Sequence, residues 1–331
     1  MIDGAFTNSR GITPFKRSVL PPDRNSSAVV IFHHGFTDHC ARHLHVLTPL
    51  ADAGCILIGF DAYGHGRTGP ASPWFRSYIR DFNELVKDFI EFTVYVRGQN
   101  PGLPIYSMGH SMGGTIVALA ACRRPELYSG VILSSPLVQV IPKSVKSYLT
   151  EWVAWGMNWV VPGLSYLRII KRQPIERGMN DEAAVKAMKT DPYWDPLPHR
   201  FGSVCSLLQA ARMLQAEAPT GLSAMPLFIQ QGTTDVATKA EWLLDFLQRR
   251  LNLTGTLNCT NPADTNLRSK GYYIGERLSE AGERNTLSSE RNVTLFVVDG
   301  GFHDLIHDNQ TPQCLDKLVE WVKIGIGKGK N

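Results

Sequence analysis

The sequence predicts an α/β fold in which a mostly parallel, doubly wound sheet carries an inserted helical cap. Short, continuous apolar segments are typical of strands that helices cover on both faces. Segments with helical spacing of apolar residues separate most of them, which indicates parallel pairing through helical crossovers. The alternation stops within residues 137–225, where helical stretches and prolines occur without a convincing core strand. The expected strands span residues 28–33, 55–60, 131–136, 226–232 and 293–298, with one more that begins at Ile105 and ends at the Gly-x-Ser-x-Gly motif that starts at Gly109.

The segments between these strands predict the remaining elements. Residues 12–17 and 28–33 flank a turn-rich stretch, residues 21–26, and we expect them to form an antiparallel hairpin that leads into the sheet. Leucines spaced three residues apart, followed by a glycine stop, predict a helix over residues 41–53. The expected helices span residues 41–53, 78–96, 239–251 and 313–324, with one more that begins after Ser111.

These patterns divide the chain into a core and a cap. Residues 1–136 and 226–331 are expected to form the α/β core, and residues 137–225 the helical cap. Residues 253–291 are polar and lack periodicity, and they far exceed the roughly 2–6 residues of most α/β connections. We expect them to form a surface insertion that the chemistry does not need.

A candidate nucleophile lies where the strand that begins at Ile105 meets the following helix. The sequence there is Gly-x-Ser-x-Gly, with Ser111 between Gly109 and Gly113. The glycines allow a strand-to-helix turn so tight that the central residue is strained and its side chain exposed. The next helix directs its positive N-terminal end at the same point. A glycine-rich turn with an incidental serine is the alternative, and the flanking strand and helix patterns favour the nucleophile.

A serine hydroxyl at neutral pH needs a base within hydrogen-bond reach. His303 follows the last expected strand, and the carboxyl ends of parallel strands meet at the edge that carries Ser111. His307, one helical turn further on, is the alternative base. His110 is expected to point away from Ser111 and to support the turn.

The base in turn needs an acid that orients its ring. Asp235 directly follows an expected strand, and Ser111, Asp235 and His303 then have the chain order of one known type of catalytic triad. Asp304 adjoins the histidine but would have difficulty turning back to its ring. Asp245 falls inside an expected helix.

The tetrahedral intermediate of acyl transfer needs hydrogen-bond donors. We expect them to be the backbone N–H of Met112, directly after the serine, and of Phe36, in the loop after the first parallel strand. No metal or other cofactor is expected: His39 and His43 have helical spacing, but no Glu-x-x-His pattern accompanies them. The glycine-rich loop at residues 61–69 lacks the Gly-Lys-Ser/Thr of a phosphate-binding loop.

The composition is that of an ordinary globular enzyme, with 331 residues, 43% of them hydrophobic and 19% charged. The formal net charge is +4 without a Lys/Arg block, so nucleic acid is not expected as a partner. Six cysteines without Cys-x-x-Cys spacing, and an N-terminus unlike a signal peptide, predict a cytoplasmic protein that is not secreted. No apolar stretch approaches the roughly 20 residues that a membrane-spanning helix needs.

Taken together, these motifs resemble those of the monoglyceride lipase and lysophospholipase branch of the α/β-hydrolase family. The resemblance spans residues 29–321 except the insertion at residues 253–291. The matching stretches are His34-Gly35 with Asp38-His39 and Arg42, Asp61-x-x-Gly64-His65-Gly66, Gly109-His110-Ser111-Met112-Gly113-Gly114, Ser135-Pro136-Leu137, Gly232-x-x-Asp235 and Gly301-Phe302-His303. The resemblance implies an α/β-hydrolase fold with a helical cap and hydrolysis, without a cofactor, of the ester of a single-chain acylglycerol or a related lipid.

The resemblance also assigns roles to single residues. It implies a triad and oxyanion donors that agree with the residues selected above: Ser111, Asp235 and His303, and Phe36 with Met112. It further places Asp38 and Arg42 near the glycerol end of the substrate pocket. Phe36 replaces the small residue usual in its loop, and Asp38 stands where glutamate is common. Both departures would narrow or reshape the alcohol pocket.

The cap independently indicates a lipid substrate. Residues 145–170 are rich in Trp, Val and Leu that cover more than one helical stripe. An acyl chain needs an apolar tunnel, and a cap that contacts a lipid surface needs an exposed apolar side with tryptophan. A helix buried between cap and core would also be apolar all round. The lipid interpretation adds a peripheral membrane surface as a partner.

We therefore expect a serine hydrolase that cleaves monoacylglycerols to a fatty acid and glycerol through an acyl-Ser111 intermediate. A lysophospholipase or a broad carboxylesterase is the first alternative, and preference for acyl-chain length separates these activities. A catalytically silent hydrolase fold that serves as a binding module is the alternative from another class. The complete set of serine, aspartate and histidine argues against it.

Overall fold

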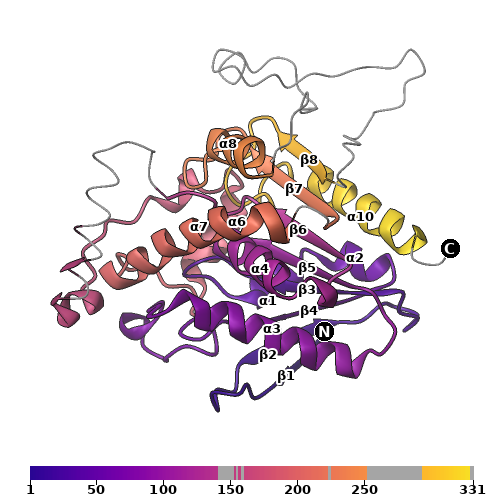
Figure 1. Ribbon diagram of the computed structural model, residues 1–331, viewed down its shortest axis with the longest axis horizontal. Coiled ribbons are helices and arrows are strands. Elements are labelled where there is room, and N and C mark those ends of the chain that lie inside the picture. Colours follow the sequence, from indigo (N-terminus) through magenta and orange to yellow (C-terminus); the bar gives the residue numbers. More distant parts are fainter. Residues whose placement is uncertain (141–152, 154–155, 158–159, 223–224, 252–292, 329–331) are drawn as a thin grey trace.

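The computed structural model describes residues 1–140, 153, 156–157, 160–222, 225–251 and 293–328. Within them, eight strands form one sheet in the order β1-β2-β4-β3-β5-β6-β7-β8 (Figure 1). The strands are β1 (Ile2–Ala5), β2 (Phe15–Val19), β3 (Ala28–His33), β4 (Cys55–Phe60), β5 (Ile105–His110), β6 (Gly130–Ser134), β7 (Leu227–Gly232) and β8 (Val293–Val298). Strands β3 to β8 run parallel to one another, whereas β2 pairs antiparallel with both β1 and β4.

Helices cover both faces of this sheet (Figure 1). The described helices are α1 (Cys40–Leu44), α2 (Thr48–Asp52), α3 (Phe82–Gln99), α4 (Met112–Arg123), α6 (Glu182–Thr190), α7 (Phe201–Gly221), α8 (Ala240–Arg250) and α10 (Thr311–Lys328), with 3-10 turns η1 (Pro73–Phe75), η2 (Pro125–Leu127), η3 (Pro162–Tyr166) and η4 (Ile175–Arg177). In β3, Val29 and Ile31 belong to the buried cluster that also includes residues of α3, α4, α7 and α8, and Val30 and Phe32 belong to the cluster with residues of α1, α2 and α10. Burial on both faces is the reason that the central strands are continuously apolar.

The prediction that residues 12–17 and 28–33 form an antiparallel hairpin is wrong. Residues of β2 pair with β4 on one side and with β1 on the other, and β3 takes parallel partners on both of its edges. A strand that is apolar on both faces is covered best in the middle of the sheet, whereas most of β2 is only half-buried. The turn-rich residues 21–26 therefore lead the chain past β4 to β3.

Two helix boundaries also differ from the expectation. The helix expected over residues 41–53 is two short helices, α1 and α2, because Pro49 has no N–H to continue a helix and stands instead in the first turn of α2. The helix expected from residue 78 begins at Phe82. The Asp81 side chain accepts a hydrogen bond from the Asn83 backbone N–H at 2.9 Å and so defines the start of α3.

The described part of residues 137–225 contains η3, η4, α6 and α7, and its only strand pairing within the described residues is an antiparallel bridge between Ile170 and His199. Helix α7 packs against α4 through Leu207, Ala210 and Leu214, which belong to the same cluster as the sheet. The division into core and cap stays a prediction. The insertion at residues 253–291 lies outside the described residues, as do residues 145–152, 154–155 and 158–159 of the apolar stretch 145–170. No described helix is both long and apolar enough to span a membrane.

Glycines allow α4 to begin against the backbone of β3 and β5. A Cβ on Gly109 would lie 2.2 Å from the Gly113 carbonyl oxygen, and one on Gly113 would lie 2.2 Å from the His33 carbonyl oxygen. These are backbone atoms, so no side-chain rotation would relieve the clash. The turn at the end of β5 therefore depends on these two glycines.

We expect Gly113→Ala to lower the free energy of unfolding by about 3 kcal/mol, because the added methyl overpacks a backbone contact. The matched control is Gly98→Ala near the end of α3, where a Cβ meets nothing within 4 Å. The control should raise the free energy of unfolding by about 0.5 kcal/mol through helix propensity. Urea unfolding measures both. Equal midpoints for the two variants would contradict this account of the turn.

Candidate active site

Ser111 stands in a strained turn between β5 and α4. Its backbone has φ +53° and ψ −118°, in the left-handed half of φ that non-glycine residues rarely adopt. The Ser111 N–H donates to the Ser134 carbonyl at 3.0 Å, and the Ser111 carbonyl accepts from Gly114 and Leu137. This bonding to β6 and α4 fixes the serine at the carboxyl edge of the sheet, beside the positive end of α4.

Asp235 and His303 meet at the same edge. They follow β7 and β8, which are neighbours in the sheet, and His303 Nδ1 lies 2.8 Å from Asp235 Oδ2. The His303 ring also packs 4.9 Å, between centroids, from the ring of His110, the residue before Ser111. The structure thus brings the predicted acid to the predicted base, and the base beside the turn that carries the serine.

The surroundings of this pair favour a charged carboxylate. Burial would raise the pKa of Asp235, but the His303 ring and the hydrogen bonds from Thr238 hold that pKa well below its usual range. Burial would likewise lower the pKa of His303, and the charge and hydrogen bond of Asp235 outweigh it, so the pKa is raised. A carboxylate that stays ionised next to a histidine can orient the ring and stabilise its protonated form.

Thr238 and Gln231 support Asp235 and were not found from the sequence. The Thr238 hydroxyl donates to Asp235 Oδ2 at 2.7 Å and lies 3.2 Å from His303 Nδ1, while Gln231 Nε2 donates to the same Oδ2 at 2.9 Å. The backbone N–H groups of Ala237 and Thr238 donate to Asp235 Oδ1 at 2.7 and 2.8 Å. Polar residues near a strand end give no distinctive sequence signal, because only the fold determines which carboxylate they reach.

The loop after β3 lies directly beside the serine. A Cβ on Gly35 would be 3.4 Å from the Cβ of Ser111, so the loop backbone approaches the turn closely. His34 holds this loop: its Nδ1 bonds the Gly35 carbonyl at 2.7 Å, and its Nε2 accepts from the Ala62 N–H at 2.9 Å. The Phe36 ring packs 5.1 Å from that of His199. This position suits the Phe36 N–H as an oxyanion donor, and that role, like the role of Met112, stays a prediction.

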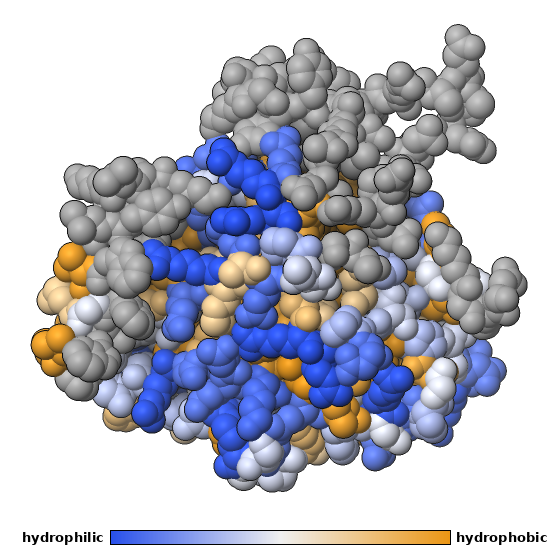
Figure 2. Space-filling model, in the orientation of Figure 1, coloured by the Kyte–Doolittle hydropathy of each residue, from blue (hydrophilic) through white to orange (hydrophobic). Residues whose placement is uncertain are grey.

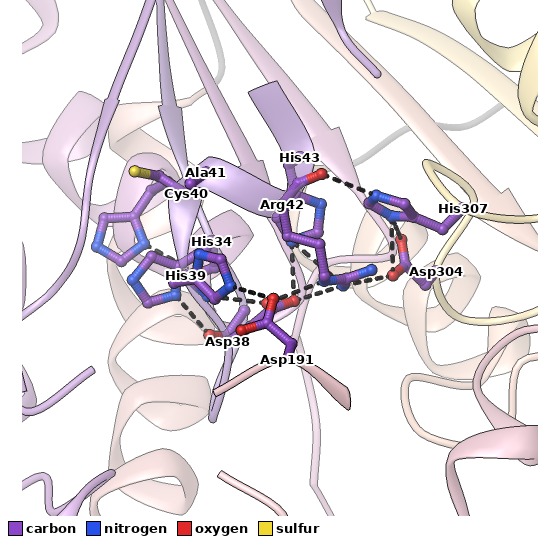
Figure 3. A network of polar contacts seen from close by, with 12 residues as sticks. His34, Asp38, His39, Cys40, Ala41, Arg42, His43, Asp191, Asp304 and His307 are labelled. Atoms are coloured by element: carbon purple, nitrogen blue, oxygen red, sulfur yellow. Dashed lines mark hydrogen bonds and ion pairs between the residues drawn. The ribbon is translucent and has the colours of Figure 1, made fainter. Parts of the chain in front are cut away.

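Asp38 and Arg42 lie in a buried charged network (Figure 3). Arg42 pairs with Asp38 and with Asp304, and Asp38 Oδ2 also lies 2.8 Å from His43 Nε2. Burial would raise the pKa of Asp38, but Arg42 and His43 hold it well below its usual range. Placement of Asp38 and Arg42 at the glycerol end of the pocket stays a prediction.

The alternative base, His307, has partners at both ring nitrogens. Its Nδ1 lies 3.2 Å from the Asp304 carboxylate, and its Nε2 lies 3.1 Å from the Arg42 carbonyl oxygen. His43, Asp304 and His307 offer ligand atoms within 4.8 Å of one another. The Arg42 guanidinium already contacts the Asp304 carboxylate and supplies the positive charge there, so this donor set suits a metal cation poorly.

The parallel sheet, the strained serine at its carboxyl edge and the adjoining aspartate–histidine pair define the class of α/β-hydrolases with a serine nucleophile. A family model described as "Serine aminopeptidase, S33" matches residues 24–260. The chain belongs to this family, which confirms the resemblance expected from its motifs.

Named relatives agree with this assignment. A monoglyceride lipase of Rattus norvegicus is 30% identical over 65% of this chain and 67% of the relative. A monoacylglycerol lipase of Mycolicibacterium smegmatis is 31% identical over 66% of this chain and 73% of the relative. A phospholipase of Bacillus subtilis is 26% identical over 50% of this chain and 60% of the relative. The chain is a carboxylic ester hydrolase of the lipase and esterase type.

Solved structures confirm the fold. A soluble variant of monoglyceride lipase from Saccharomyces cerevisiae, in complex with a substrate analogue, has a TM-score of 0.72 at 17% identity, covering 97% of this chain and 94% of that one. A monoacylglycerol lipase from Paleococcus ferrophilus has a TM-score of 0.66 at 20% identity, covering 94% and 99%.

We expect Thr238→Val to lower kcat for ester hydrolysis about tenfold, because a hydrogen bond to a charged group contributes about 1.5 kcal/mol or more. The change is nearly isosteric and removes the hydroxyl, which donates to Asp235 and also lies 3.0 Å from the Ser135 carbonyl oxygen. Thr238→Ser keeps that hydroxyl and should stay within about twofold of the wild-type kcat. Steady-state kinetics on a soluble ester measure both variants. A valine variant as active as the serine variant would rule out this role for the hydroxyl.

Proposed function

We propose that the protein hydrolyses monoacylglycerols to a free fatty acid and glycerol through an acyl-Ser111 intermediate. The observation that carries the proposal is the 2.8 Å contact between His303 Nδ1 and Asp235 Oδ2 at the edge where Ser111 stands in its strained turn. Asp235 orients the ring and stabilises its charged form, which leaves His303 Nε2 as the base for the serine hydroxyl.

The reaction proceeds in two halves. Ser111 Oγ attacks the ester carbonyl carbon while His303 takes its proton, and the carbonyl oxygen becomes an oxyanion that accepts hydrogen bonds from the N–H groups of Phe36 and Met112. His303 then returns the proton to the glycerol oxygen as the carbon–oxygen bond breaks. A water molecule attacks the acyl-serine with His303 as base, and the fatty acid and the free Ser111 hydroxyl result.

The choice of substrate rests on two supports. The first is the relatives named above, of which those from Rattus norvegicus and Mycolicibacterium smegmatis are a monoglyceride lipase and a monoacylglycerol lipase. The second is the sequence of the cap, which is apolar enough to enclose an acyl chain. A lysophospholipid is the second candidate, and it is favoured by the relative that is named a phospholipase.

We expect purified protein to release fatty acid from 2-monooleoylglycerol faster than from lysophosphatidylcholine or a short-chain ester. Ser111→Ala should lower kcat by about 10⁴-fold or more, because it removes the nucleophile. Release of fatty acid and glycerol measures the turnover. Faster turnover of the lysophospholipid or of the short ester would contradict the monoacylglycerol assignment while keeping the serine chemistry, and turnover without Ser111 would contradict both.

We further propose that the protein docks on lipid surfaces through an apolar patch beside η1 and η3. Hydrophobic side chains are exposed at the left edge of the space-filling view (Figure 2), where Figure 1 draws the chain that precedes α7. Arg168 joins the two segments, since its guanidinium donates to the carbonyls of Pro73 and Trp74. We call these exposed residues the apolar patch: Trp74, Phe75, Val160, Val161, Tyr166, Leu167 and Ile169.

Vesicle flotation tests the apolar patch. The double variant Phe75→Ser/Ile169→Ser should bind monooleoylglycerol-containing phosphatidylcholine vesicles about tenfold more weakly, because it removes two side chains that would enter the interface. Val94 on α3 is also exposed and lies outside the patch, so Val94→Ser is the matched control and should bind as the wild type does. Equal flotation of all three proteins, or no binding by the wild type, would contradict the docking proposal.

A further inference from the structure

Arg42 joins two loops that are far apart in the sequence. Its Nε donates to Asp38 Oδ1 at 3.0 Å, and its Nη2 donates to Asp38 Oδ2 at 2.5 Å and to Asp304 Oδ2 at 2.7 Å (Figure 3). The three side chains are only 8%, 5% and 4% exposed, in the order Arg42, Asp38 and Asp304. One guanidinium therefore holds two buried carboxylates that belong to different parts of the chain.

Each carboxylate stands next to a group that the proposed reaction uses. Asp38 is two residues after Phe36, the proposed oxyanion donor, and its N–H makes the turn bond to the Gly35 carbonyl. Asp304 directly follows His303, the proposed base. The contact between Arg42 and these carboxylates therefore spans the distance between the oxyanion loop and the histidine loop.

We propose that Arg42 is a positioning residue that fixes the loop carrying Phe36 against the loop carrying His303. The inference rests on the proposed function and deepens it, because it states how the base and the oxyanion donor keep their relative position. The same contact commits the Asp304 carboxylate to Arg42, while Asp235 makes the hydrogen bond to the His303 ring.

The geometry favours this role over a contribution to stability. A buried ion pair gains little net stability, because the cost of removing the charges from water offsets their attraction. It does restrict geometry: the planar fork of arginine fits Asp38 through two nitrogens, which a lysine ammonium cannot reproduce. His307 strengthens the connection, since its ring bonds both Asp304 and the Arg42 carbonyl.

The geometry also favours positioning over direct contact with substrate. The Arg42 Nε and Nη2 atoms are already committed to the two carboxylates, and the side chain is nearly inaccessible. A residue that binds the glycerol moiety would change KM when altered. A residue that keeps the base and the oxyanion donor in place would change kcat, because displacement of about 1 Å can cost up to about 10² in rate.

The electrostatic surroundings of His303 provide a second measurement. The groups facing its ring are Asp235 from the loop after β7, His110 from β5 and its own neighbour Asp304. Burial lowers the pKa of His110 to about 3, so this ring is neutral. Asp304 adds to the influence of Asp235 in raising the pKa of His303. Loss of the Asp304 charge should therefore lower that pKa and move the acid side of the activity profile to lower pH.

The test uses the full chain with two conservative variants, Asp304→Asn and Arg42→Lys. The asparagine keeps the shape of the side chain and still accepts a hydrogen bond, and the lysine keeps the charge of Arg42 but not its fork. The matched control is Asp88→Asn, which weakens the ion pair between the partly exposed Arg10 and the buried Asp88 on α3. Each protein is titrated with a fluorophosphonate so that rates refer to active sites, and kcat, KM and the pH profile are measured on a soluble ester and on 2-monooleoylglycerol.

We expect Asp304→Asn and Arg42→Lys each to lower kcat about tenfold with KM within about twofold. The kcat of the double variant should be about equal to that of either single variant, because both substitutions break the same contact. Only Asp304→Asn should move the acid limb to lower pH. Asp88→Asn should keep its kcat while losing thermal stability.

Three results would overturn the inference. A raised KM with unchanged kcat in Arg42→Lys would assign Arg42 to substrate binding. Unchanged kcat in both variants, with lowered thermal stability alone, would make the contact merely structural. Turnover that does not depend on Ser111 would overturn the proposed function and this inference with it, whereas Ser111-dependent turnover that both variants leave unchanged overturns the inference alone.

Discussion

The close backbone approach of β3, β5 and α4, which glycines make possible, is the constraint on which the rest of the site depends. Gly109 faces the Gly113 carbonyl, and Gly113 faces the His33 carbonyl, at distances that no Cβ would fit. The chain must therefore turn from strand to helix within one residue, and Ser111 takes the φ of +53° that this turn requires. Local strain at the serine is offset by the packing of α4, which is almost entirely buried.

The sheet order turns this local constraint into a site. Because β5, β6, β7 and β8 are neighbours and parallel, the loops that follow them converge at one edge. Asp235 and His303 reach each other there from two of those loops, and the side chains of Thr238 and Gln231 donate to the same carboxylate oxygen that His303 contacts. Hydrogen bonds from these partners thus stabilise the negative charge of Asp235, which keeps the carboxylate ionised while it is buried.

Much of this architecture could be predicted from the sequence. The central strands have continuous apolar sequences because both of their faces are covered. Ser111 lies in a pentapeptide whose two glycines are required because a Cβ at either position would clash with backbone atoms. The family and the type of hydrolase followed from the same motifs. The expected acid and base also proved to be neighbours in space, although their catalytic roles remain a proposal.

The failures have physical causes of a different kind. The place of β2 beside β4, instead of β3, depends on competition among strands for the middle of the sheet, and a local turn signal carries no information about it. The division of the helix at residues 41–53 follows from Pro49, which the periodicity of the leucines obscured. The pairing of Arg42 with Asp304 joins positions 262 residues apart, and only the folded chain brings such charges together.

The central claim is that Ser111 forms the covalent intermediate. The most direct measurement is mass spectrometry of the protein after reaction with a fluorophosphonate, with the modified peptide sequenced. The account predicts one phosphonyl group per chain, located on Ser111, and loss of ester hydrolysis in proportion to its formation. Modification of another residue, or complete modification of Ser111 with hydrolysis retained, would contradict it.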